Sequence, residues 1–171
     1  GCGEWNTIHE EARQDTKTRR REAPGLAPSI PMTLEEVAAA PITYRASGDP
    51  EFDRGLGGGL VPGSVVLLGG DPGIGKTTLL LQTLVKLLQP HEILLYVSGE
   101  ESPQQISLRA KRLRITHPGL RLLAETNWEA IMQSIAALNP VLVVLDSIQT
   151  TYTNTLTSTP GSVSQVQELA S

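Results

Sequence analysis

The run Gly70–Thr77 reads Gly-Asp-Pro-Gly-Ile-Gly-Lys-Thr, and it constrains the fold more than any other feature of the chain. It matches the pattern G-x-x-x-x-G-K-[ST], which is typical of a loop that wraps the phosphates of a nucleotide. The apolar run Val65–Leu68 before it predicts a buried parallel strand. The spacing of apolar residues over Thr78–Leu88 predicts a helix after it. A glycine-rich turn between a strand and a helix collects backbone N–H groups at the helix N-terminus, where phosphate binds favourably.

Two residues at the end of this loop carry most of its chemistry. Lys76 is expected to place a positive charge on the β and γ phosphates, and the Thr77 hydroxyl is expected to ligate Mg²⁺. The alternative is a plain glycine-rich turn with an exposed lysine, which the flanking strand and helix patterns disfavour. The predicted nucleotide-binding residues are Gly70, Asp71, Pro72, Gly73, Ile74, Gly75, Lys76, Thr77 and Thr78.

The rest of the chain alternates between strand and helix patterns. Apolar runs at Ile93–Val97, Leu120–Leu123 and Val141–Leu145 predict three further strands. Ser102 and Asn127 are suited to cap the helices between them. Such alternation predicts an α/β fold with a mostly parallel sheet and flanking helices, in which ligands bind at the carboxyl ends of the strands.

Three carboxylates follow predicted strands and are therefore candidates for this edge. Asp146 comes directly after a strand and is predicted to hold Mg²⁺, although an aspartate that only starts a turn would look the same. Ser147 follows it where some nucleotide-hydrolysing proteins place a glutamate. We therefore assign the general base to Glu100, after the neighbouring strand, and leave Glu101 to favour the start of the next helix. The sequence leaves open an exchange of these two roles.

Composition excludes several classes of protein. The formal net charge of −4 gives no overall nucleic-acid signature, and no run of eighteen apolar residues suggests a membrane span. A single cysteine fits a reducing compartment, so we expect a cytoplasmic protein. A basic group at Arg109, Lys111, Arg112 and Arg114 is either a solvated helix face or a contact for DNA or a neighbouring subunit's nucleotide. The first residue is not methionine, so we expect a piece of a longer protein.

Four segments together resemble the bacterial RadA (Sms) family of DNA-repair ATPases, within the RecA superfamily. Cys2–Thr7 is similar to the end of that family's N-terminal zinc ribbon, and Phe52–Ser64 to the approach to its phosphate loop. Ser98–Ser102 is similar to its catalytic-glutamate segment, and Pro160–Val166 to the stretch after its magnesium aspartate.

The resemblance implies a DNA-dependent ATPase of recombinational DNA repair. Such a protein would process branched recombination intermediates by branch migration, as a homo-hexamer on single-stranded or branched DNA, with ATP and Mg²⁺. Carried over by position, Lys76 and Thr77 bind phosphate and Mg²⁺, Asp146 holds the metal and Glu100 activates water. Cys2 would be one zinc ligand in the complete protein.

The same resemblance implies a domain organisation. Residues 1–31 would be a remnant of the zinc ribbon with a charged linker, and residues 32–171 the N-terminal part of a RecA-like ATPase domain that is incomplete at both ends. A structural zinc site needs four ligands, and Cys2 alone cannot supply them. Two other functions stay open: a nucleotide-dependent binding module with little turnover, and a small-molecule P-loop kinase.

Overall fold

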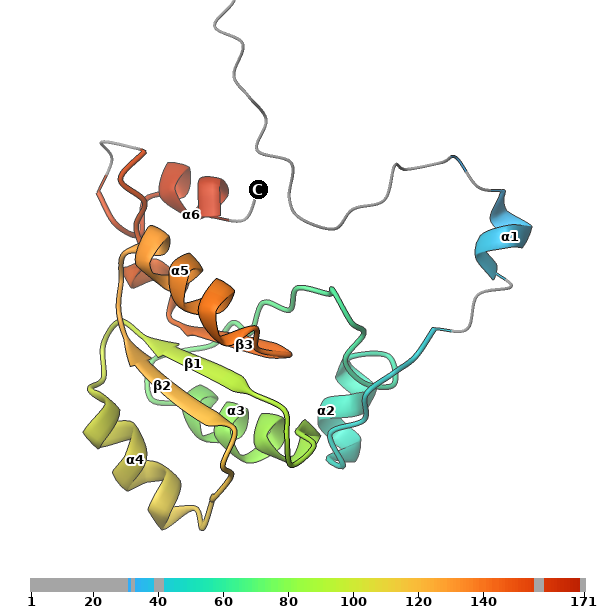
Figure 1. Cartoon of the computed structure of the whole chain (residues 1–171), viewed down its shortest axis with the longest axis horizontal. Helices are drawn as coiled ribbons and strands as arrows, with labels where there is room; N and C mark the ends of the chain where they lie inside the picture. The colour runs from blue at the N-terminus through green and yellow to red at the C-terminus, as the bar shows by residue number, and fades with distance from the viewer. Residues whose placement is uncertain (1–30, 32, 39–41, 156–158, 170–171) are drawn as a thin grey trace, which may run out of the picture. The chain divides into compact units, whose positions relative to one another are not determined.

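The computed structural model describes residues 31, 33–38, 42–155 and 159–169 (Figure 1). The chain forms two units, Gly1–Pro41 and Ile42–Ser171. The first contributes helix α1 (Leu34–Ala38), which begins with a capping box. The Thr33 hydroxyl accepts the N–H of Glu36, whose carboxylate accepts the N–H of Thr33. The predicted zinc ligand Cys2 lies outside the described residues, and the predicted boundary at residues 31 and 32 stays a prediction.

The second unit is built on a parallel sheet. Strands β1 (Leu94–Ser98), β2 (Leu120–Ala124) and β3 (Leu142–Asp146) lie in the order β2-β1-β3, and both pairings are parallel. Helix α4 (Pro103–Arg112) connects β1 to β2, and helix α5 (Trp128–Leu138) connects β2 to β3. The predicted α/β fold with a parallel sheet and flanking helices is confirmed.

The strand order places the connecting helices on opposite faces of the sheet. The chain leaves β1 in one direction to form β2, then returns past β1 to form β3. Because both crossovers follow the right-handed rule, α4 and α5 cover different faces, as Figure 1 shows. Helix α3 (Lys76–Leu84), which continues as the short 3₁₀ helix η1 (Val85–Leu87), lies on the same face as α4.

Three short helices complete the described elements. These are α2 (Pro50–Gly55), the 3₁₀ helix η2 (Ile148–Thr150) and α6 (Val163–Leu169).

Alternation along the strands divides the core into two layers. On the α3 and α4 face, the buried residues are Leu81, Leu84, Leu87, Leu88, Leu94, Tyr96, Ile106 and Val144. On the α5 face, they are Leu95, Val97 and Ile131. All five residues of β1 are buried, as expected of a central strand covered on both sides.

The predicted helix caps are present. Ser102 accepts the N–H of Gln105, whose side chain accepts the N–H of Ser102, and Pro103 is the first residue of α4. Asn127 accepts the N–H of Ala130 at 2.9 Å and starts α5. These contacts are local in the sequence, so the local pattern was sufficient to predict them.

One predicted strand is wrong. Val65–Leu68 lies outside any strand, and Val65 and Leu67 are 98% and 83% exposed. A strand needs a neighbour to pair its backbone N–H and C=O groups. Both edges of β1 are occupied by β2 and β3, and the run pairs with neither of their outer edges. The apolar composition of Val65–Leu68 indicated a strand, but composition alone does not show which neighbouring strand it would pair with.

The turn that leads into β2 depends on a glycine packed against the backbone of another segment. A Cβ atom added at Gly119 would overlap the carbonyl oxygen of Glu92. We expect Gly119→Ala to lower the free energy of unfolding by about 2–3 kcal/mol, because the backbone must move to accommodate the methyl group. Urea unfolding measures the change. Gly55→Ala is the matched control, since a Cβ added there meets no atom within 4 Å; equal losses in the two variants would contradict the packing argument.

Candidate active site

The predicted phosphate loop curves around the side chain of its own lysine. Lys76 Nζ donates to the carbonyl oxygens of Gly70 at 2.7 Å and Asp71 at 2.9 Å. Gly73 and Gly75 have φ angles of +78° and +105°, which residues with a Cβ rarely adopt. Residues 70–75 are exposed and precede the first turn of α3. The loop is therefore accessible and opens onto a helix N-terminus, as an anion site requires.

The structure brings Thr77 and Asp146 together from two distant segments. Thr77 is the second residue of α3, and Asp146 is the last residue of β3. The Thr77 hydroxyl donates to Asp146 Oδ2 at 2.7 Å. A hydroxyl and a carboxylate offer the hard oxygen atoms that Mg²⁺ prefers, and Mg²⁺ usually completes its shell with water and substrate phosphates. The donor set therefore fits the ion that the sequence predicts.

Tyr96 in the middle of β1 also reaches this carboxylate. Its hydroxyl donates to Asp146 Oδ2 at 2.6 Å, the same oxygen that Thr77 contacts. Burial raises the pKa of the Tyr96 phenol well above its usual value, and the neighbouring Asp146 carboxylate raises the pKa further. The hydroxyl therefore keeps its proton and acts as the donor.

The two candidate glutamates lie in different environments. Glu101 is half-buried, and its Oε1 accepts from Arg109 Nη1 at 2.8 Å, which ties it to α4. Glu100 is exposed, and its Oε1 accepts from the Ser147 hydroxyl at 3.3 Å. Since Ser147 adjoins Asp146, the Glu100 carboxylate lies beside the end of β3. The geometry thus favours Glu100 over Glu101 for chemistry at this edge.

Short contacts fix the end of β1, both against β3 and within the turn that follows it. The N–H of Gly99 donates to the carbonyl oxygen of Asp146 at 3.0 Å, and the buried Ser98 hydroxyl accepts the N–H of Glu101 at 2.9 Å. Sequence reasoning missed Ser98, Tyr96 and Ser147 as site residues. Tyr96 alone gave a signal, because a tyrosine in an apolar strand needs a partner for its buried hydroxyl.

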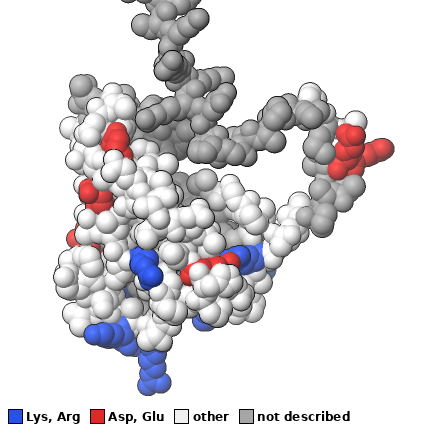
Figure 2. All heavy atoms as spheres, viewed as in Figure 1, with Lys and Arg blue, Asp and Glu red and all other residues white. Residues whose placement is uncertain are grey.

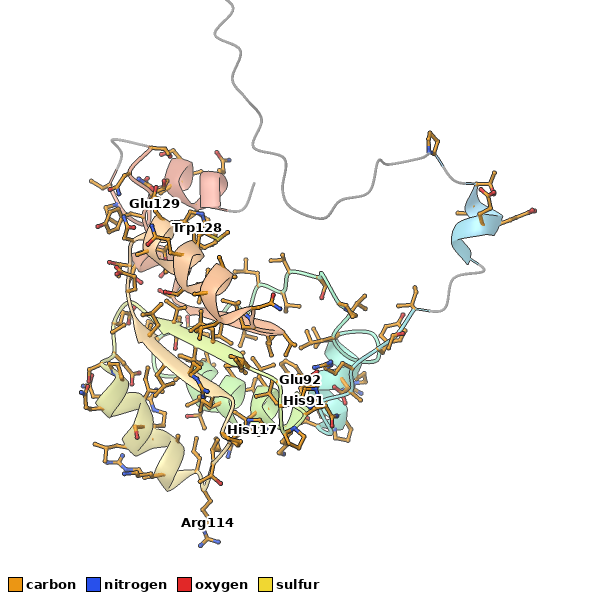
Figure 3. The ribbon with its side chains drawn as sticks, viewed as in Figure 1. His91, Glu92, Arg114, His117, Trp128 and Glu129 are labelled. Atoms are coloured by element: carbon orange, nitrogen blue, oxygen red, sulfur yellow. The ribbon has the colours of Figure 1, made fainter. Side chains whose placement is uncertain are left out.

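The basic group lies apart from the Thr77 and Asp146 contact. Arg109, Lys111 and Arg112 lie in the last turn of α4, and Arg114 follows it. Figure 2 shows blue side chains protruding at the lower end of the view, over α4, and Figure 3 shows Arg114 extending away from the ribbon. Arg109 is engaged by Glu101, whereas Lys111, Arg112 and Arg114 take no part in the salt bridges of the described residues.

Within the part of the chain that the structure describes, no cluster of three or more His, Cys, Asp or Glu side chains is arranged to hold a metal ion by itself. The Thr77 and Asp146 pair differs from such a cluster, because its ion would take most of its ligands from phosphate and water. None of the described helices is long and apolar enough to cross a membrane.

Comparison with known families agrees with this geometry. The model of a family described as "AAA domain" matches residues 43–170, which include the loop, both strand ends and α6. The chain belongs to this family. Membership implies nucleotide binding, and it assigns the α/β unit described above to an AAA domain.

Individual relatives are more specific. The chain is 49% identical to DNA repair protein RadA of Bacillus subtilis, over 98% of this chain and 37% of the relative. It is 46% identical to RadA of Listeria monocytogenes, over 98% and 36%, and 44% identical to RadA of Escherichia coli, over 99% and 38%. The chain is therefore homologous to RadA, which confirms the resemblance in the sequence. It spans just over a third of the length of these relatives.

Proposed function

We propose that this AAA domain binds Mg²⁺ and ATP and hydrolyses ATP as part of a DNA-dependent ATPase of recombinational repair. The contact between Thr77 and Asp146 carries the proposal. It joins the first turn after the phosphate loop to the end of a sheet strand, and Glu100 lies at the end of the adjacent strand. In this proposal, the carboxyl ends of the strands would bring the phosphate loop, the metal carboxylate and the base to one edge of the sheet.

Each residue has a distinct role in this proposal. The backbone N–H groups of the loop and the Lys76 ammonium bind the β and γ phosphates, and Lys76 exchanges its loop carbonyls for phosphate oxygens. Thr77 and Asp146 hold Mg²⁺, which when bound neutralises charge on those oxygens. Glu100 accepts a proton from the attacking water. Its exposure leaves room for that water, whereas Glu101 is occupied by Arg109.

The DNA part of the proposal is supported by homology. The relatives are named DNA repair proteins, and the chain aligns with them over nearly its whole length. We extend this to branched recombination intermediates, a homo-hexamer and a zinc site that includes Cys2 in the complete protein. With a net charge of −4, DNA binding has to rely on local basic groups, for which Lys111, Arg112 and Arg114 are candidates.

An ATPase assay with and without single-stranded DNA tests the proposal. We expect Mg²⁺-dependent release of phosphate from ATP that single-stranded DNA stimulates severalfold. Tight ATP binding without turnover under either condition would instead indicate a binding module. Turnover that requires a small phosphoryl acceptor would indicate a kinase.

A further inference from the structure

We propose that Tyr96 is a positioning residue for the metal carboxylate, holding Asp146 in the orientation that binds Mg²⁺. The inference rests on the proposed function and deepens it. It arises because two hydroxyl donors from different elements, Thr77 and Tyr96, converge on the single oxygen Asp146 Oδ2.

The sheet register explains how Tyr96 reaches this carboxylate. Tyr96 pairs with Val144 of β3, and Asp146 lies two residues further along the same strand, on the same face. A tyrosine at this position can therefore extend along the strand to the carboxyl edge. The residues on either side of it in β1, Leu95 and Val97, end in methyl groups and cannot donate a hydrogen bond.

The ring of Tyr96 is held rigidly. Only 1% of the residue is exposed, and it packs in the cluster that contains Leu81, Leu84 and Ile106 of the covering helices. A hydroxyl on a fixed ring restricts the position of the carboxylate it contacts, in the way that outer partners orient metal ligands. The hydroxyl of Thr77, by contrast, is itself a proposed metal ligand. Tyr96 is thus the partner of Asp146 that can keep its contact unchanged while the ion binds.

Because Oδ2 of Asp146 already accepts two hydrogen bonds, Oδ1 is the oxygen expected to face the ion. Both donors contact Oδ2, and no donor among the described residues contacts Asp146 Oδ1. With Oδ2 fixed, Oδ1 stays available for the ion or for a water molecule bound to it. Loss of the Tyr96 hydroxyl would leave Thr77, itself a proposed metal ligand, as the one donor to Oδ2, so the orientation of the carboxylate would be less restricted.

Mn²⁺ binding tests this inference, because Mn²⁺ substitutes for Mg²⁺ and is detected by electron paramagnetic resonance without turnover. The dissociation constant for Mn²⁺ is measured on the full-length protein with saturating ATPγS. We expect Tyr96→Phe to weaken Mn²⁺ binding about tenfold. ATPγS binding in EDTA should change less than about twofold, since the phosphate loop is untouched. Tyr44→Phe removes a hydroxyl from an exposed tyrosine before α2 and serves as the matched control, with no expected change.

A double-mutant cycle separates positioning from a general loss of structure. If Tyr96 acts through Asp146, adding Tyr96→Phe to Asp146→Asn should cause little further loss of Mn²⁺ affinity. Superimposable Mn²⁺ curves for wild type and Tyr96→Phe would overturn the inference. So would an equal loss of ATPγS binding in EDTA, which would indicate a structural role. A wild-type protein without any metal-dependent nucleotide binding would instead contradict the proposed function, and the inference with it.

Discussion

Replacing Lys76 by alanine is expected to lower the rate of ATP hydrolysis of the full-length protein by a factor of about 10³. The ammonium lies among the loop carbonyls of Gly70 and Asp71, where the β and γ phosphates are proposed to bind. The substitution removes the only full positive charge in the run Gly70–Thr77. Charge that develops on the phosphate oxygens then lacks its main protein partner. Phosphate release at saturating ATP measures the effect.

Lys86→Ala is the matched control for this substitution. Lys86 is exposed and lies in η1, at the far end of the same helical segment. The Lys86→Ala variant loses the same positive charge but leaves the phosphate loop intact, so the ATP turnover of this variant should stay within about twofold of wild type. Near-normal turnover in Lys76→Ala would contradict the assignment of the loop.

The second large effect is expected from Glu100→Gln, which should keep ATP binding and lose turnover. The amide has nearly the shape of the carboxylate but cannot accept a proton from water. Loss of a general base typically costs about 10²–10⁴ in rate. Binding should be retained, because Glu100 is exposed and contacts the hydroxyl of Ser147 rather than the loop. Parallel measurements of ATPγS affinity and phosphate release separate the two quantities.

Glu101→Gln tests the alternative that the sequence left open, in which Glu101 rather than Glu100 is the general base. This substitution weakens the contact with Arg109 and leaves Glu100 in place. We expect a change in turnover of no more than about threefold, because a partly exposed ion pair contributes little. If Glu101→Gln loses turnover while Glu100→Gln keeps it, the base is Glu101, and the pair with Arg109 must open during the reaction.

Local signals were sufficient to predict most of the fold. The caps at Ser102 and Asn127 depend on residues within three positions, so the sequence specified where α4 and α5 begin. The strand Val65–Leu68 was predicted wrongly because pairing is a non-local property. Its apolar composition matched that of β1, but only β1 has hydrogen-bonded neighbours on both sides.

In the candidate site, too, some contacts could be predicted from sequence patterns, whereas others depend on how distant segments pair. The meeting of Thr77 with Asp146 follows from two patterns and the rule that ligands bind where parallel strands end. The contact of Tyr96 with the same carboxylate depends on the register between β1 and β3, which a single sequence does not show. The distinction between Glu100 and Glu101 needed the position of Arg109 as well, eight residues away on α4.

A crystal structure of the full-length protein with Mg²⁺, ADP and aluminium fluoride would show directly whether the nucleotide and the ion occupy the proposed site. We expect the β-phosphate within the loop Gly70–Thr77 and Mg²⁺ about 2.1 Å from the Thr77 hydroxyl. Asp146 should contact the ion or one of its water molecules, and the Glu100 carboxylate should accept from the water that lies across the aluminium from the β-phosphate. A nucleotide bound elsewhere, or an ion that contacts neither Thr77 nor Asp146, would contradict it.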